Sequence, residues 1–118
     1  MSISYWCLLF IGIILSAFGG IFLKLGSVEI VYDGAWKTLE HALLNWKILL
    51  GVALYIVPSF IWVFMLRKVD ISYLQPMFSL VYVVTPVLAF LIIHENIPVN
   101  RMIGTMIIII GVIVVARA

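Results

Sequence analysis

The sequence predicts an all-α membrane protein with four transmembrane helices and an amphipathic interfacial helix between the first two. Of its 118 residues, 66% are hydrophobic and 10% are charged, whereas a soluble domain keeps about a quarter of its residues charged. Mean hydropathy is +1.31, and four apolar runs approach the roughly 20 residues that a spanning helix needs. These runs fill most of the chain, so we expect one transmembrane domain over residues 1–118 and no separate catalytic domain.

The first predicted helix runs from about Ile3 to Lys24. Tyr5 and Trp6 lie near its start, where aromatic side chains favour the membrane interface. The run is too long for a signal peptide, and it lacks both a basic start and a small-residue cleavage site. We therefore expect a retained span, in which Cys7 is a small buried apolar residue.

The long connection after this helix contains an amphipathic pattern. Apolar residues recur at i, i+3, i+7 and i+10, polar residues take the opposite side, and Asp33 is the predicted N-cap. Beside two spans, such a helix either lies in the plane of the membrane interface or serves as a simple helical connector. The apolar positions are Trp36, Leu39, Leu43 and Trp46, and the polar positions are Lys37, Glu40, His41 and Asn45.

Three further spans follow the amphipathic segment. They are predicted from about Trp46 to Leu66, from Ile71 to Ile93 and from Pro98 to Ala116. Pro98 suits the first helical turn, where its missing N–H is not needed. Pro58 and Pro86 lie in mid-span, where each removes a backbone hydrogen bond and permits bending.

Basic residues do not fix the orientation of these spans, because the two sides of the membrane carry similar numbers of them. An even number of spans places both termini on one side. That side holds Arg67, Lys68 and Arg117, and the other side holds Lys24, Lys37, Lys47 and Arg101.

Polar side chains form one stripe on each of the first three spans. Such groups cost free energy in hydrocarbon unless they are paired or face water, so their spacing shows which faces look inward. The stripes either enclose a substrate-binding cavity or form packing seams, where Ser, Thr and Gly are common. They comprise Ser16, Gly20 and Lys24; Tyr55, Ser59 and Trp62; and Ser72, Gln75, Ser79 and Tyr82, continued by Pro86.

Three charged residues complete the candidate substrate site. Lys24 either extends to the lipid headgroups or, with Arg101, holds a phosphate on a lipid or metabolite. Glu95 follows the third span and either pairs with Arg101 or is a solvated loop carboxylate. His41 and His94 lack partners at metal-ligand spacing, and no nucleophile–base pair is visible. We therefore predict no metal, no cofactor and no enzymatic activity.

The fourth span has a different pattern, because "GTMIIIIG" places Gly104 and Gly111 seven residues apart on one face. Small residues let helix backbones approach closely. Four helices of this size make a thin bundle, so we expect this face to be a dimer interface, with a seam inside the chain as the alternative. A net charge of +2 is too small and dispersed to indicate nucleic-acid binding.

The sequence also resembles the drug/metabolite transporter superfamily over nearly its whole length. The cues are the Pro-Met-x-Ser-Leu run from Pro76 to Leu80, Glu95 and Arg101 after the third span, and the two glycines of the fourth. One group of this size, the small multidrug resistance exporters, depends on a glutamate in the first helix. Here that position is Ser16, and no span holds a carboxylate, which counts against proton-coupled drug export.

A second group, the flippase subunits for 4-amino-4-deoxy-L-arabinose-phosphoundecaprenol, is more similar. Their first helix has a Ser–x–x–Gly–x–x–x–x–Lys pattern, matched by Ser16, Gly19 and Lys24, and they share Pro-Met-x-Ser-Leu and the pair His94–Glu95. One departure is that the first loop is longer here than in one of the two flippase subunits.

The resemblance implies a transporter of the bacterial inner membrane that flips a polyprenyl-phosphate-linked sugar for lipopolysaccharide modification. It implies a homodimer, or a heterodimer with a similar small subunit. Two alternatives remain: a small-metabolite or drug exporter of the same superfamily, and a non-transporting accessory subunit of a glycosyltransferase system.

Overall fold

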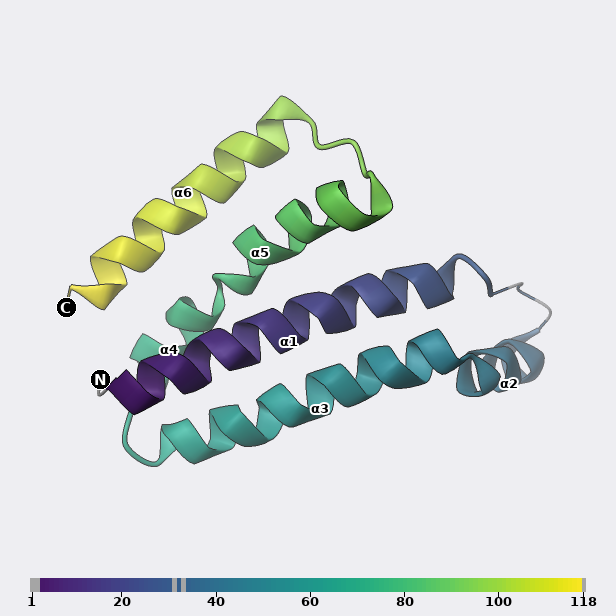
Figure 1. The fold of residues 1–118 in the computed structure, drawn as a ribbon, viewed down its shortest axis with the longest axis horizontal. Coiled ribbons are helices and arrows are strands. Elements are labelled where there is room, and N and C mark those ends of the chain that lie inside the picture. The colour runs from purple at the N-terminus through teal and green to yellow at the C-terminus, as the bar shows by residue number, and fades with distance from the viewer. Residues whose placement is uncertain (1–2, 31, 33, 118) are drawn as a thin grey trace.

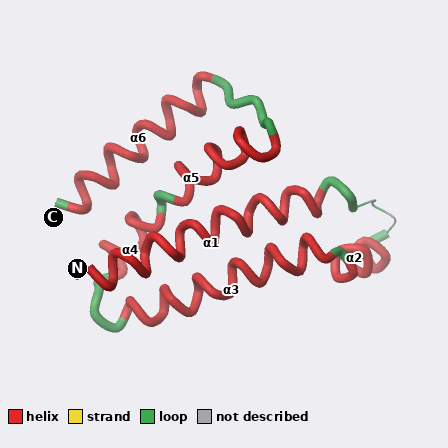
Figure 2. The backbone as a smooth tube through the Cα atoms, viewed as in Figure 1, coloured by secondary structure: helices red, strands yellow, loops and turns green. Residues whose placement is uncertain are grey.

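The computed structural model describes residues 3–30, 32 and 34–117, and over these residues its regular elements are all helical (Figures 1 and 2). Within the described chain, four helical segments are long and apolar enough to cross a membrane: α1, α3, Ile71–Ile93 taken as one segment, and α6. The predicted fold class is therefore confirmed. The elements are α1 (Ile3–Ser27), α2 (Ala35–Leu44), α3 (Trp46–Leu66), α4 (Ile71–Phe78), α5 (Val81–Leu88), the π-helical η1 (Ala89–Ile93) and α6 (Val99–Ala116).

Successive spans run in opposite directions, because the turns between α3 and α4 and between η1 and α6 are short. The two termini lie at one end of the molecule, and α2 lies at the other end, where α1 finishes and α3 begins (Figure 1). The last turn of α1, with Lys24, is at this second end, whereas α6, with Arg101 in its first turn, begins on the far side of α5, well apart from the end of α1 (Figure 1).

α1 is the central helix and α6 is the most peripheral span. α1 packs along α3 and also contacts α5. In the best spanning window, 39% of α1 is buried, against 6% of α6. Burial of apolar side chains holds one end of the bundle together, through a core cluster of Leu9, Ile13, Met65, Leu74, Met77 and Val112.

The third span, Ile71–Ile93, is broken where a continuous helix was predicted. α4 ends at Phe78, a turn at residues 79–80 follows, and α5 begins at Val81. The Ser79 hydroxyl donates to the Pro76 carbonyl oxygen within this turn. Pro86 has no N–H and cannot complete the helical ladder, and the chain continues after α5 as η1. The third span therefore consists of two differently registered halves.

Three smaller expectations need correction. α1 continues past Lys24 to Ser27. Pro98 is the N-cap of α6, with φ −63° and ψ 156°, and the helix begins one residue later at Val99. Cys7, expected to be buried, is exposed, because α1 turns this side away from the core.

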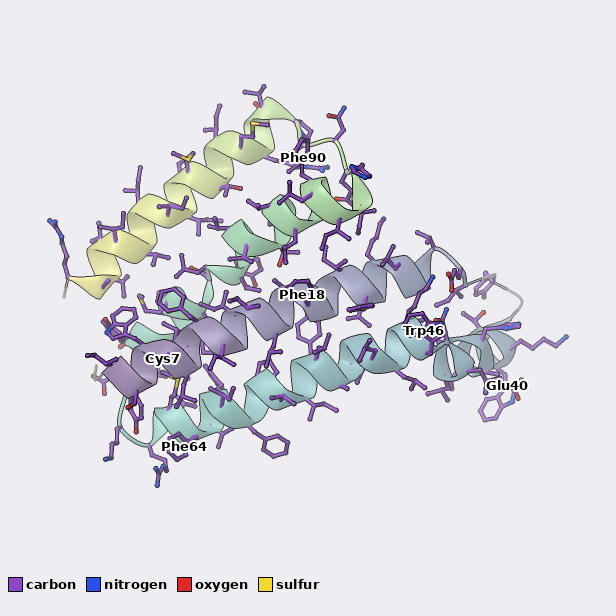
Figure 3. The ribbon with its side chains drawn as sticks, viewed as in Figure 1. Cys7, Phe18, Glu40, Trp46, Phe64 and Phe90 are labelled. Atoms are coloured by element: carbon purple, nitrogen blue, oxygen red, sulfur yellow. The ribbon has the colours of Figure 1, made fainter. Side chains whose placement is uncertain are left out.

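The predicted amphipathic helix is present as α2, and no residue in it is buried. The apolar side chains of α2 are exposed; Trp36, for example, is 73% exposed. Trp46, at the start of α3, is also exposed, and Figure 3 shows it close to the junction between α2 and α3. The N-cap predicted at Asp33 lies outside the described residues, and Gly34 with φ 84° precedes α2. Location in the membrane interface remains a prediction.

A polar clamp of Glu29, Asn45 and Lys47 joins the end of α1 to the start of α3. Asn45 Nδ2 donates to the Gly26 carbonyl oxygen at 3.3 Å and to Glu29 Oε2 at 3.1 Å. Asn45 Oδ1 accepts from the Lys47 N–H at 3.0 Å, and Lys47 Nζ pairs with Glu29. Asn45 thereby caps α3, and the clamp ties the start of α3 to the end of α1.

Candidate functional site

A pocket of ≈ 250 Å³ lies where α1, α3 and α4 meet, and we call it the polar pocket. Five of its lining residues belong to the three stripes found in the sequence, so the structure brings one stripe from each of these spans together. The lining consists of Ser16, Tyr55, Pro58, Ser59, Trp62, Gln75 and Phe78.

Ser16 is the only buried polar side chain in the described part of the chain, at 8% exposed. Its hydroxyl has no hydrogen-bond partner among the described residues. The hydroxyl oxygen is nevertheless not sealed off, because every fully buried side-chain oxygen or nitrogen of the described residues has a hydrogen-bond partner. Ser16 is therefore free to bind a ligand or water that enters the polar pocket.

The other polar side chains of the polar pocket differ in whether they already form hydrogen bonds within the protein. Ser59 Oγ donates to the Tyr55 carbonyl oxygen at 2.9 Å, one turn back in α3, which leaves its oxygen only as an acceptor. Gln75 is exposed and offers amide donors and an acceptor. Tyr55 and Trp62 add aromatic surface. Hydrogen-bonding groups on aromatic walls are typical of small-molecule sites.

Gly20 does not line the polar pocket, but it lies next to Tyr55, which does. A Cβ added at Gly20 would lie 3.2 Å from Tyr55 Oη. The absence of a side chain therefore makes room for the Tyr55 hydroxyl at the contact between α1 and α3.

Ser79 and Tyr82 were expected to share a face with Gln75, but the structure does not bring them to the polar pocket. The break at residues 79–80 changes the register between α4 and α5. Ser79 Oγ donates to the Pro76 carbonyl oxygen, and Tyr82 is 63% exposed.

Lys24 is exposed, and its side chain has no ion pair among the described residues. It lies eight residues beyond Ser16, or ~12 Å along the axis of α1 at ~1.5 Å per residue. Glu29, which is nearby in the sequence, pairs with Lys47 instead. Hydrogen bonds from Lys47 and Asn45 lower the pKa of Glu29 below its ordinary value.

Glu95 and Arg101 do not pair with each other in the structure, which removes one of the two alternatives stated for Glu95. The backbone N–H of Glu95 donates to the Ala89 carbonyl oxygen at 3.2 Å. This bond closes η1 after His94, which has φ 61°. Arg101 is exposed at the start of α6.

A second pocket, of ≈ 440 Å³, was not predicted from the sequence. It lies between the second half of the third span and α6, and we call it the apolar groove. Sequence patterns offered little signal for it, because its walls are interchangeable apolar residues. They include Pro86, Val87, Phe90, Met102, Thr105 and Met106.

Gly104 and Gly111 are not part of a seam within the chain. A Cβ added at either glycine would meet no atom within 4 Å. The intramolecular alternative is therefore not found, and a role in dimerisation stays a prediction. Among the described residues, no three His, Cys, Asp or Glu side chains come close enough to hold a metal ion.

Comparison with known proteins gives one match. The model of the EamA-like transporter family matches residues 1–117. Curated proteins and solved structures gave no match.

Proposed function

The chain belongs to the EamA-like transporter family of the drug/metabolite transporter superfamily, and from this premise we propose that it flips a polyprenyl-phosphate-linked sugar across the membrane. Members of the family are transporters, and four apolar helices make this chain a multi-pass membrane protein. The observation that carries the proposal is the polar pocket, where uncharged polar side chains and aromatic rings converge on the unpaired Ser16 hydroxyl.

The chemistry of the polar pocket suits a sugar. Sugar hydroxyls both donate and accept hydrogen bonds; Ser16 and Gln75 offer both functions, and Ser59 offers an acceptor. Tyr55 and Trp62 offer flat apolar surfaces to the carbon-bound faces of a sugar ring. A substrate whose hydrocarbon tail stays in the bilayer needs shelter only for its sugar and phosphate, so a pocket of ≈ 250 Å³ is an adequate passage for part of the headgroup.

The absence of carboxylates in the spans favours this substrate over a cationic drug. No Asp or Glu occurs within α1, α3, Ile71–Ile93 or α6. A proton-coupled exchanger of cations needs a titratable acid in the membrane, and a buried cation needs a counter-charge. A neutral sugar needs neither, whereas aminoarabinose carries a cationic amine, so the lack of carboxylates favours an uncharged sugar on the same kind of lipid carrier.

Lys24 is the proposed partner of the phosphate. A lysine ammonium binds phosphate as a point charge, and Lys24 lies at the end of α1, exposed and unpaired among the described residues. The pattern of Ser16, Gly19 and Lys24, which resembles that of the aminoarabinose-lipid flippase subunits, supports the same substrate class. On this resemblance we propose a location in the bacterial inner membrane, and a working unit of two such small chains, identical or different.

The test is reconstitution of the purified chain in liposomes with a radiolabelled polyprenyl-phosphate sugar. Translocation is read from the loss of accessibility to a membrane-impermeant oxidant of the sugar. We expect faster translocation than in protein-free liposomes, and Lys24→Ala should slow it by about tenfold, the loss typical of one charge-assisted hydrogen bond. Lys68→Ala, at the opposite end of the molecule, is the matched control and should transport normally.

Other outcomes would contradict the proposal in recognisable ways. Transport of small water-soluble metabolites, without the lipid-linked sugar, would favour an exporter. No transport by the chain alone, together with increased activity of a glycosyltransferase added to the liposomes, would favour an accessory subunit. Normal lipid transport by Lys24→Ala would exclude this lysine from the site.

A further inference from the structure

We infer that the apolar groove between the third span and α6 holds the polyprenyl chain of the substrate, with its phosphate beside Arg101. This inference rests on the proposed function and adds a second subsite to it. The sequence marked Arg101 as a candidate phosphate ligand, but its patterns did not point to the groove itself.

The apolar groove has the size and lining of a site for hydrocarbon. Its volume of ≈ 440 Å³ falls within the ~300–1,000 Å³ typical of ligand pockets. Phe90 of η1 and Met106 of α6, from opposite walls, are 55% and 59% exposed, and Figure 3 shows Phe90 near the start of α6. Methionine side chains adapt to the shape of an apolar partner.

The groove offers no free hydrogen-bonding side chain. Thr105 is the only lining residue with a polar side chain, and its hydroxyl donates to the Arg101 carbonyl oxygen at 2.8 Å. A sugar or other polar headgroup would therefore lose its hydrogen bonds to water without replacement. A hydrocarbon chain loses no hydrogen bonds there, and because it comes from the bilayer it gains packing contacts with the side chains of the groove.

Arg101 gives the groove a positive end. It is exposed, and its side chain has no ion pair among the described residues. It stands in the first turn of α6, where no acidic residue occurs and where the helix dipole adds further positive potential. The next residue, Met102, already lines the groove. The positive charge of Arg101 is thus followed directly by the apolar surface of the groove. A lipid whose anionic group is joined to a long hydrocarbon chain is complementary to this arrangement.

A second copy of the chain is a less suitable occupant. The predicted dimer face of α6 carries Gly111, which is nine residues from Met102 and hence about half a turn away at ~100° per residue. Pairing through Gly104 and Gly111 would therefore leave the apolar groove open to lipid. Moreover, no unpaired carboxylate lies on the exposed faces of α6 to meet Arg101 of another copy.

The groove and the polar pocket use different halves of the broken third span. α4 contributes Gln75 and Phe78 to the polar pocket, whereas α5 and η1 line the groove. Lys24 belongs to the last turn of α1 and Arg101 to the first turn of α6, and these turns are well separated, on opposite sides of α5 (Figure 1). The single phosphate therefore takes two successive positions in the proposal: beside Arg101 while the hydrocarbon chain occupies the groove, and beside Lys24 when the sugar occupies the polar pocket.

The experiment is photolabelling of the full chain in lipid nanodiscs with a polyprenyl phosphate that carries a diazirine in its hydrocarbon chain. Labelled peptides are identified by mass spectrometry. We expect labels on residues 83–109, on both walls of the groove. Met106→Trp, which fills the groove, should reduce labelling severalfold, because the indole takes up space that the hydrocarbon chain would otherwise occupy.

Ile113→Trp is the matched control, because Ile113 is 51% exposed on the same helix, does not line the groove and faces away from Gly104 and Gly111 at ~100° per residue. It should label like the unmodified chain, and the melting temperatures of both variants should match it. Arg101→Gln should weaken labelling by the polyprenyl phosphate, but not by a diazirine polyprenol that lacks the phosphate.

Three results would overturn the inference. They are labels that avoid residues 83–109, equal labelling of Met106→Trp and Ile113→Trp, and equally strong labelling by phosphatidylglycerol with the same diazirine, which would indicate a general lipid site. If Met106→Trp dissociated the dimer and the control variant did not, the groove would instead be a protein interface. The translocation assay on the unmodified chain tests the proposed function separately. Failure of the groove assignment therefore does not contradict the proposed function.

Discussion

Gly19 of α1 and Gly51 of α3 face each other across the main helix contact. A Cβ added at Gly19 would lie 3.0 Å from the Gly51 carbonyl oxygen, and one added at Gly51 would lie 2.9 Å from the Gly19 carbonyl oxygen. The two backbones therefore approach more closely than any side chain allows. This contact lies beside Tyr55, whose ring is 3.1 Å from a Cβ at Gly19, so it also positions one wall of the polar pocket.

Gly51→Ala should destabilise the protein by about 1–3 kcal/mol, the typical cost of overpacking. The new methyl group would meet Leu23 Cγ at 2.8 Å as well as the Gly19 carbonyl oxygen, and α1 and α3 would have to separate. Thermal unfolding in detergent measures the change. Gly111→Ala is the matched control within a single chain: it meets no atom within 4 Å and, compared on the monomeric fraction, should leave stability unchanged or raise it by up to about 1 kcal/mol. Equal behaviour of the two variants would disprove the close contact.

Ser16→Ala should slow translocation about 2- to 10-fold, corresponding to one hydrogen bond of about 0.5–1.5 kcal/mol to the substrate. Stability should not fall, because the hydroxyl has no partner among the described residues. Ser27→Ala, at the exposed end of the same helix, removes only a bond to the Lys24 carbonyl oxygen and should transport normally. If Ser16 were only a packing residue, Ser16→Ala would lower the melting temperature and leave the transport rate unaffected.

Gly111→Leu should shift the protein from dimer toward monomer in mild detergent. The residue is exposed and its Cβ position is open, so leucine fits within one chain but blocks close approach of a second helix. Light scattering after size-exclusion chromatography measures the mass. Ile113→Leu, about 200° around α6 from Gly111 at ~100° per residue, should leave the mass unchanged. An unaltered dimer in Gly111→Leu would exclude this face as the interface.

The polar clamp should make stability depend on pH through Glu29. Hydrogen bonds from Lys47 and Asn45 hold the pKa of Glu29 below its ordinary value of 4.5. The contribution of the Glu29 carboxylate to stability is thus fully present above pH 4.5 and is lost as pH falls through the folded-state pKa. Glu29→Gln should melt at a lower temperature than the unmodified chain at neutral pH.

The difference in melting temperature between Glu29→Gln and the unmodified chain should shrink on acidification below pH 4.5. Glu40→Gln is the control, since Glu40 is exposed on α2 and lies outside the clamp (Figure 3). It should melt like the unmodified chain at neutral pH. A difference for Glu29→Gln that persists unchanged in acid would show that the carboxylate charge contributes nothing.

The spans were predictable because each depends on local sequence. A run of about 20 apolar residues is driven into the bilayer whatever its neighbours are, and the bounds of α3 agree with the prediction at Trp46 and Leu66. The break at residues 79–80 was not predicted. Periodicity alone favours one continuous helix through Pro76 and Pro86, and the position of a kink depends on which packing partners stabilise the bent form.

The candidate site was predictable only in part. Ser16, Tyr55, Ser59, Trp62 and Gln75 were identified by spacing within their own helices, and they converge in one pocket. The same reasoning failed to separate Ser79 and Tyr82 from that group, because it assumed a straight third span. The apolar groove gave no signal, since its walls differ from any lipid-facing surface only by being concave.

The sequence by itself determined that this protein spans a membrane four times, where α2 begins its amphipathic pattern, and that no carboxylate enters the spans. These properties follow from the solvation of individual residues and from helical periodicity. Only the tertiary structure decided which stripes meet, how closely Gly19 approaches Gly51, and that Arg101 is left without Glu95. Such relations depend on the angles and register between helices, which are set by the packing of residues distant in the chain.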